Sequence, residues 1–208
     1  MLEEAYTVRD AGPRDDADIA GLVVEGFLDK FRPIFGRRMD RSMAVMDKWV
    51  RLEHSLGGVR SLVIENNANA EIAASVGVRT GPSEDDDALS RGLWESLRRN
   101  LGFPRASWAA SLLSYPRYAA STSEAYVERL VVSPAHRRHG MAHALLEAAE
   151  DLARRAGKRT IGLHVSENNI PALRLYEAHG YVERGHQRSW LTGYFLGIRK
   201  WLYLQKEL

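Results

Sequence analysis

The feature that most constrains the fold is a strand, a basic turn and an amphipathic helix that follow one another directly over residues 125–156. The strand is an apolar, partly β-branched run, and Ser133-Pro134 ends it. The helix begins near Gly140 and stops before Gly157. Its apolar stripe at helical spacing consists of Leu145, Leu146, Ala149, Leu152 and Ala153. A helix with one apolar face next to an apolar strand buries that face against a sheet, which favours a layered α/β fold.

The rest of the chain supplies further strands and helices around this unit. The spacing of apolar residues predicts strands at residues 6–9, 61–64, 71–78, 160–165, 181–183 and about 194–205. Helices are predicted at about 15–30, 40–54 and 168–180. The segment 31–36, which contains Pro33, is expected to interrupt the first of these helices. We expect a single domain over residues 1–208, with a helical insertion at about 80–123.

The composition excludes several classes of protein. A formal net charge of +2 is too small for a nucleic-acid-binding surface, so no nucleic-acid partner is expected. The chain has no cysteine, which excludes disulfides, thiolate metal sites and an acylated cysteine intermediate. No apolar run is long enough to cross a bilayer, and the first ten residues lack the pattern of a secretory signal. We therefore expect a cytoplasmic protein without a membrane partner.

Two histidines, one in the basic turn and one in the helix that follows it, have a spacing that can hold a metal ion. His139 and His143 stand at positions i and i+4. Gly140 occupies the position where a metalloprotease helix would carry its glutamate, and no acidic partner follows in that pattern. We therefore expect no metal site.

The basic turn itself is the strongest candidate for a binding site. The first amides of a helix lack intrahelical partners, and the helix dipole adds partial positive charge there. Gly140 allows a ligand to approach the backbone, and Arg137, Arg138 and His139 add further positive charge. These properties predict a site for a pyrophosphate group. The alternative is a solvated basic turn without a ligand.

The spacing Arg137-x-x-Gly140-x-Ala142 resembles the coenzyme A (CoA) signature of the GNAT superfamily of acetyltransferases. Upstream, residues 128–134 resemble the fourth strand of that family and its following turn. Downstream, the pattern from Asn169 through Tyr176 to Gly180-Tyr181 resembles its second signature helix. The resemblance is strong over about 125–208, weak over 6–78 and absent over about 80–123.

The resemblance implies a definite fold and a definite set of ligand contacts. The expected fold is a mixed, mostly antiparallel sheet of six to seven strands flanked by helices. Its fourth and fifth strands splay apart, and the helical insertion lies between the third and fourth strands. In this family the pantetheine arm pairs with the fourth strand, and the pyrophosphate meets amides of the turn. The residues that would bind acetyl-CoA are Leu130, Val131, Val132, Arg137, Arg138, His139, Gly140, Met141, Ala142, Asn169 and Tyr176.

The expected reaction is transfer of the acetyl group of acetyl-CoA directly to a primary amine. A lysine-like amine is neutral in roughly one molecule in 2,500 at pH 7, so a general base is useful. Glu128 is the candidate base, because a regular strand would place its side chain on the same face as Leu130. Glu124 and Tyr126 share this parity and are further candidates. Tyr176 matches the tyrosine that often stands near the thioester sulfur in GNAT proteins, where its hydroxyl can protonate the departing thiolate.

Each assignment has a structural alternative. Glu128 could pair with a nearby arginine, Tyr176 could be a core residue, and Asn169 could cap a helix. A different class of function is a non-catalytic module that binds or senses acyl-CoA. The expected acceptor is the amine of a small molecule or a peptide. The insertion could line the acceptor site, form a homodimer contact through Trp94 or Trp108, or only extend the packing.

Overall fold

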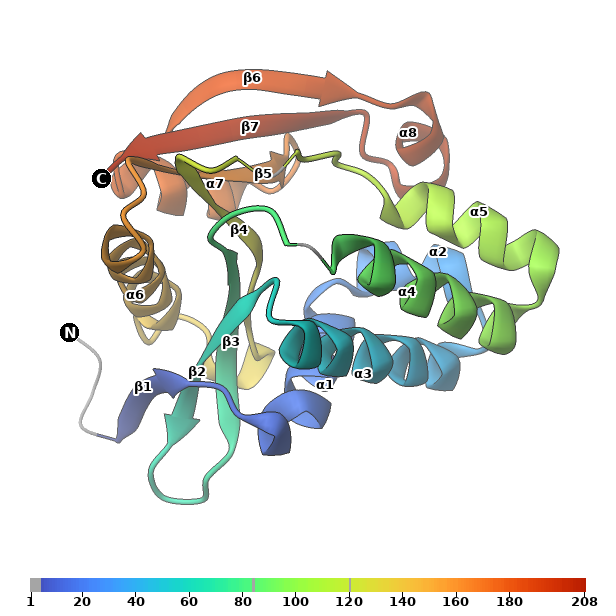
Figure 1. Ribbon diagram of the computed structural model, residues 1–208, viewed down its shortest axis with the longest axis horizontal. Coiled ribbons are helices and arrows are strands. Elements are labelled where there is room, and N and C mark those ends of the chain that lie inside the picture. Colours follow the sequence, from blue (N-terminus) through green and yellow to red (C-terminus); the bar gives the residue numbers. More distant parts are fainter. Residues whose placement is uncertain (1–4, 84, 120) are drawn as a thin grey trace.

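The computed structural model describes residues 5–83, 85–119 and 121–208, and Figure 1 shows a twisted sheet with helices on both faces. The strands are β1 (Tyr6–Asp10), β2 (Arg60–Asn66), β3 (Ile72–Arg79), β4 (Glu124–Val132), β5 (Thr160–Ser166), β6 (Val182–Arg188) and β7 (Lys200–Glu207). They form one seven-stranded sheet in the order β1-β2-β3-β4-β5-β7-β6. Neighbouring strands are antiparallel except β4 and β5, which are parallel. This is the mixed, mostly antiparallel sheet that the sequence predicts.

The helices divide between the two faces of the sheet. They are α1 (Asp16–Gly26), α2 (Leu28–Phe35), α3 (Met39–Leu56), α4 (Asp86–Leu101), α5 (Phe103–Leu113), α6 (Met141–Arg155), α7 (Ile170–Ala178) and α8 (Trp190–Leu196), with short 3-10 turns at Pro13–Asp15 and Pro134–His136. Helices α6 and α7 cover one face, called here the α6–α7 face. Helices α1 to α5 cover the other, called here the α1–α5 face.

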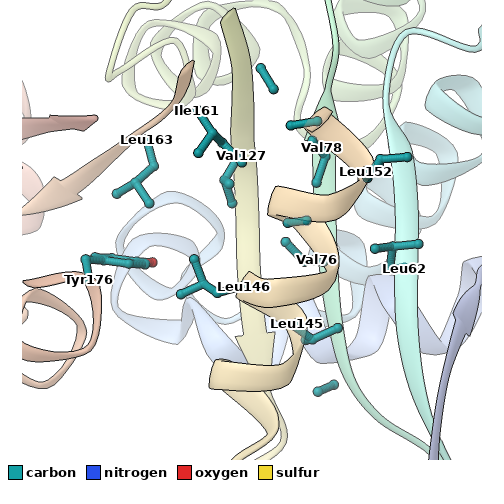
Figure 2. Packing of buried hydrophobic residues seen from close by; sticks show 14 of the residues in the cluster. Leu62, Val76, Val78, Val127, Leu145, Leu146, Leu152, Ile161, Leu163 and Tyr176 are labelled. Carbon is teal, nitrogen blue, oxygen red and sulfur yellow. The ribbon is translucent and has the colours of Figure 1, made fainter. Parts of the chain in front are cut away.

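The core on the α6–α7 face is built by the apolar stripe of α6. All five residues of the predicted stripe are buried, with Leu145 and Leu146 fully inaccessible. Figure 2 shows these leucines facing side chains of the sheet that include Val76 and Val127. The sequence pattern of this helix is therefore confirmed in detail, and α6 fixes the position of the turn that precedes it.

The predicted insertion consists of α4 and α5 and lies between β3 and β4. Its apolar residues join the core on the α1–α5 face, where Leu97 and Leu112 are almost completely buried. Trp94 packs edge-on against Phe103, and Trp108 packs edge-on against Phe195 of α8. The insertion thus extends the core within the chain and links it to the β6–β7 connection.

A β-bulge and a splay shape the middle of the sheet. In the β3–β4 pairing, Gly77 lies opposite Arg129 while Val78 lies opposite Val127, so Glu128 is the extra residue of the bulge. The parallel β4–β5 pairing ends at Val127 and Leu163. Beyond these residues the two strands diverge, as Figure 1 shows. We call the region where β4 and β5 are no longer paired the β4–β5 opening; the loss of pairing confirms the predicted splay between the fourth and fifth strands.

Two predicted element boundaries are wrong. Residues 31–36 do not interrupt a helix, because α2 runs from Leu28 to Phe35 and buries Phe31, Ile34 and Phe35. The actual break is at Phe27, between α1 and α2. The predicted strand at about 194–205 is also too long, because α8 occupies its first residues. Ser189 caps α8 by accepting from the amide of Thr192, and Gly197 ends it in the left-handed conformation.

Candidate active site

The turn between β4 and α6 presents an open set of backbone amides. Gly140 is the N-cap of α6 in the left-handed conformation (φ +75°), and no side chain caps this end of the helix. The first bond of the helix is donated by the amide of Ala144 to the carbonyl of Gly140, so the amides of Met141 and Ala142 have no intrahelical acceptor. A Cβ placed on Gly140 would meet nothing within 4 Å. The space beside the Gly140 Cα is therefore open to a ligand.

The arginines of this turn give it positive charge that no described carboxylate neutralises. Arg137, Arg138 and His139 are exposed, and neither arginine forms an ion pair with a described residue. The Nε atom of Arg137 donates to the carbonyl of Val132 (3.5 Å). His136 contacts the Tyr6 hydroxyl (3.1 Å), which ties the turn to β1. Free amides, a helix N-terminus and unpaired guanidinium groups together suit a pyrophosphate group.

We expect Gly140→Val to weaken acetyl-CoA binding about tenfold or more. The left-handed conformation costs a residue with a Cβ about 1–2 kcal/mol, and about 1.4 kcal/mol is a factor of ten in affinity. The matched control is Gly157→Val, because Gly157 has φ +70° and open space at the other end of α6. Isothermal titration of both variants with acetyl-CoA measures the effect. Equal affinities for the two variants would show that this turn does not hold the ligand.

The free edge of β4 offers backbone groups rather than side chains. Leu130 and Val132 pack against the core of the α6–α7 face, and Val131 is buried in the core of the α1–α5 face. Gly26 of α1 lies so close that a Cβ there would overlap the Val131 side chain. Past Val127, these residues have no β5 partner. An extended ligand could therefore pair with this edge, as an added strand does.

Glu128 lies at the β4–β5 opening in an ion pair. Its Oε1 accepts from Nε of Arg79 (2.6 Å), and Nη1 of Arg79 contacts Oδ1 of Asp86 at the start of α4 (2.6 Å). The Glu128 side chain is 27% exposed. The expectation that it shares a face with Leu130 is wrong. Because Glu128 is the extra residue of the bulge, it lies with Arg79 on the α1–α5 face, whereas Leu130 packs on the α6–α7 face.

Tyr176 reaches toward the same opening from the other face. It belongs to α7 and is 8% exposed, within the core of the α6–α7 face. Figure 2 shows its ring between Leu146 and Leu163, with the hydroxyl directed toward β4. Burial raises the pKa of Tyr176 to about 12, so the hydroxyl stays protonated and able to donate at neutral pH. Tyr176 is thus a core residue whose polar end lies near the opening.

Asn169 has the capping role that the sequence left open. Its Oδ1 accepts from the amide of Ala172 (3.3 Å), which makes it the N-cap of α7. The residue is exposed, so the cap leaves it accessible at the end of β5 that borders the opening.

The structure adds a polar and aromatic cluster on the α1–α5 face of the opening. The Tyr126 hydroxyl contacts Nδ1 of His164 (2.8 Å), and the Tyr118 ring stacks on Tyr126 with centroids 3.7 Å apart. The Tyr118 hydroxyl donates to the buried carboxylate of Glu124 (3.3 Å). The alternation of side chains along the strand predicted Tyr126 and Glu124 as candidates on the same face as Glu128. It gave no signal for Tyr118 or His164, which come from the insertion and from β5.

His164 is held in its neutral form. Burial lowers its pKa to about 4, well below the ordinary value of 6.5. Because the unfolded chain binds the proton more tightly, His164 stabilises the fold above pH 6.5, and this contribution is lost as the pH falls toward 4.

We expect the protein to lose up to about 3 kcal/mol of unfolding free energy through His164 between pH 6.5 and 4. Urea unfolding of the wild type and His164→Asn across this range separates this contribution from that of the carboxylates. The variant should show the shallower dependence on pH. Parallel curves for the two proteins would mean that His164 is not held neutral by the fold.

Two further properties of the described chain bear on the class of protein. Nδ1 of His143 contacts Nε2 of His179 (2.7 Å) and not His139. No described group of three or more His, Asp or Glu side chains is placed to hold a metal ion. None of the described helices is long and apolar enough to cross a membrane.

With the splayed sheet and the open turn in place, comparison with known proteins identifies the family. Residues 25–181 match the model of the acetyltransferase (GNAT) family, and the chain belongs to this family. A segment of 60 residues is 43% identical to the chloroplastic GCN5-related N-acetyltransferase 4 of Arabidopsis thaliana. That segment covers 29% of this chain and 21% of the Arabidopsis protein.

Solved structures show the same fold over nearly the whole chain. A crystal structure described as an acetyltransferase aligns with a TM-score of 0.66 and 21% identity, covering 97% of this chain and 98% of that one. The protein yncA of Salmonella typhimurium, solved with its cofactor acetyl-CoA, aligns with a TM-score of 0.60 and 20% identity, covering 99% and 95%. The ribosomal-protein-S18-alanine N-acetyltransferase of Escherichia coli aligns with a TM-score of 0.57 and 15% identity, covering 97% and 93%.

Proposed function

We propose that this protein transfers the acetyl group of acetyl-CoA directly to a primary amine of a small molecule or a peptide. The observation that carries the proposal is the open turn at residues 137–142, whose amides and arginines suit the pyrophosphate of CoA. The acetyl-CoA complex of a protein with the same fold supports the same donor. As the sequence leads us to expect, we place the reaction in the cytoplasm.

In the proposed reaction, acceptor and donor meet at the β4–β5 opening. Glu128 removes a proton from the ammonium group, directly or through a water molecule. The neutral amine then attacks the thioester carbon, so that a C–N bond forms and the C–S bond breaks. A free amide of the β4 edge stabilises the oxyanion, and the Tyr176 hydroxyl donates a proton to the thiolate. The nitrogen loses its second proton through water, and this proton restores the Tyr176 hydroxyl. Much of the rate comes from holding the two reactants together.

The ion pair between Glu128 and Arg79 supports a second candidate, a protein that binds acyl-CoA without turning it over. The Glu128 carboxylate already accepts from the Arg79 guanidinium at 2.6 Å, so an incoming ammonium group must compete with this ion pair. Asp86 shares Arg79, however, and the Glu128 side chain remains partly exposed. These contacts favour an accessible carboxylate that can exchange its partner when an ammonium group arrives.

The experiment that tests the proposal measures release of free CoA from acetyl-CoA in the presence of a panel of amines. The panel contains α-amino amides, alkyl amines, polyamines and short peptides, and mass spectrometry identifies each acetylated product. We expect amine-dependent thiol release with one acetyl group on nitrogen per thiol. Binding of acetyl-CoA without transfer to any member of the panel would favour the binding module instead.

A further inference from the structure

Three strands place one hydrogen-bonded chain at the β4–β5 opening. Gln187 of β6 contacts Nε2 of His164 through its side-chain nitrogen (3.0 Å), and Nδ1 of His164 contacts the Tyr126 hydroxyl (2.8 Å). Tyr126 is 5% exposed and pairs with Gly162, just before β4 and β5 separate. It lies on the same face of the sheet as Glu128.

The backbone of Arg117 fixes the orientation of the Gln187 amide. The N–H of Arg117 donates to Oε1 of Gln187 (3.0 Å), and Nε2 of Gln187 donates to the carbonyl of Arg117 (2.5 Å). Reversing the amide would place its NH2 group against the N–H of Arg117 and its oxygen against the carbonyl of Arg117. The second hydrogen of Nε2 therefore points to His164, and Nε2 of that ring must be an acceptor.

This orientation decides the tautomer of His164. A neutral ring with an unprotonated Nε2 carries its hydrogen on Nδ1, and that hydrogen points to the Tyr126 oxygen. The Tyr126 hydroxyl accepts this bond, so its own hydrogen must point elsewhere. Among the residues that the structure describes, none accepts a hydrogen bond from it. The Tyr118 ring, stacked at 3.7 Å, covers one side of the phenol and restricts where a partner can lie.

Burying a hydroxyl donor without an acceptor costs free energy, which indicates that a ligand or a water molecule accepts the hydrogen bond of the Tyr126 hydroxyl. We propose that the Tyr126 hydroxyl donates to a carbonyl oxygen of the acceptor, on the carbon next to the one that bears the reacting amine. The favoured acceptors are then α-amino carbonyl compounds rather than simple alkyl amines. This inference rests on the proposed function, because it concerns the acceptor side of the same reaction. Tyr126 is thus a specificity-determining residue that Gln187 and His164 position.

The test measures kcat/KM for glycinamide and for ethylamine in the wild type and in Tyr126→Phe. Glycinamide carries a carboxamide group where ethylamine has a methyl group. The two amines also differ in pKa, so the informative quantity is the change in their ratio between the two proteins. We expect the preference for glycinamide to fall tenfold or more in Tyr126→Phe, mainly through glycinamide. The matched control is Tyr118→Phe, which removes the neighbouring hydroxyl and should leave the ratio unchanged.

Gln187→Leu provides a second variant that keeps Tyr126 itself. Without the Gln187 amide, either nitrogen of His164 can carry the hydrogen. We therefore expect a smaller fall in the preference for glycinamide than in Tyr126→Phe, and no change in acetyl-CoA affinity. An equal loss for both amines in Tyr126→Phe would overturn the inference and leave the proposed function intact. Absence of transfer to any amine by the wild type would overturn the proposed function and this inference with it. Unchanged acetyl-CoA affinity in each variant shows that the fold is retained.

Discussion

Glu128→Gln is expected to lower kcat of acetyl transfer about 100-fold or more at pH 7 while leaving acetyl-CoA affinity unchanged. General-base catalysis contributes about 10²–10⁴-fold, and glutamine keeps the shape of the side chain but cannot accept a proton. Glutamine can still accept a hydrogen bond from Arg79, so the local structure is preserved. Initial rates of thiol release with a saturating amine measure kcat, and calorimetry measures acetyl-CoA binding.

The pH dependence separates a base from a purely electrostatic role. If Glu128 removes the ammonium proton, the variant should regain rate as the pH rises toward the pKa of the amine, because less deprotonation is then needed. Glu147→Gln, at an exposed position of α6, is the control and should behave like the wild type. A loss below threefold for Glu128→Gln, or a loss that is the same at every pH, would exclude the base role.

Arg129→Met is expected to destabilise the protein by about 3–5 kcal/mol. Arg129 Nη1 contacts Oε2 of Glu53 at 2.6 Å, and the two side chains are 7% and 2% exposed. Burial raises the pKa of Glu53, and the charge of Arg129 opposes that shift. Removing the guanidinium leaves a buried carboxylate without a counter-charge, which is the costly way to break such a pair. Urea unfolding measures the change.

The double variant Glu53→Leu with Arg129→Met identifies the cause. Replacing both partners by apolar residues of similar size is often neutral, so most of the lost stability should return. Arg154→Met removes an exposed arginine that pairs with Asp151 and with Glu150. Because Glu150 keeps Lys206 as a partner at 2.6 Å, this variant should cost less than about 1 kcal/mol. A double variant as unstable as Arg129→Met would mean that lost packing, rather than the unpaired carboxylate, causes the effect.

Local patterns explain which parts of the structure could be predicted. The α6 stripe and the turn before it follow from spacing along a single helix and from the conformational freedom of Gly140. For this reason the sequence predicts the open amides without knowledge of distant residues. The splay between β4 and β5 followed from the resemblance to GNAT proteins, and the β4–β5 pairing confirms it.

Long-range contacts explain what the sequence could not predict. Sequence patterns assume that side chains along β4 alternate regularly between the two faces of the sheet, and they cannot reveal an extra residue. Because Glu128 is the extra residue of the bulge, its side chain and that of Leu130 lie on opposite faces and not on the same face as predicted. Arg79, which holds Glu128, is 49 residues away in the sequence. The chain from Gln187 to Tyr126 joins three strands and depends on the backbone of Arg117. Such contacts are decided by the sheet order, which no local pattern encodes.

The central claim is that the turn before α6 binds the pyrophosphate of CoA through its backbone. The most direct measurement is a titration of ¹⁵N-labelled protein with CoA, followed by amide resonances in ¹H–¹⁵N spectra. We expect saturable binding with the largest shifts at the amides of residues 138–143. Failure to bind CoA, or binding that leaves these amides unchanged, would contradict the claim.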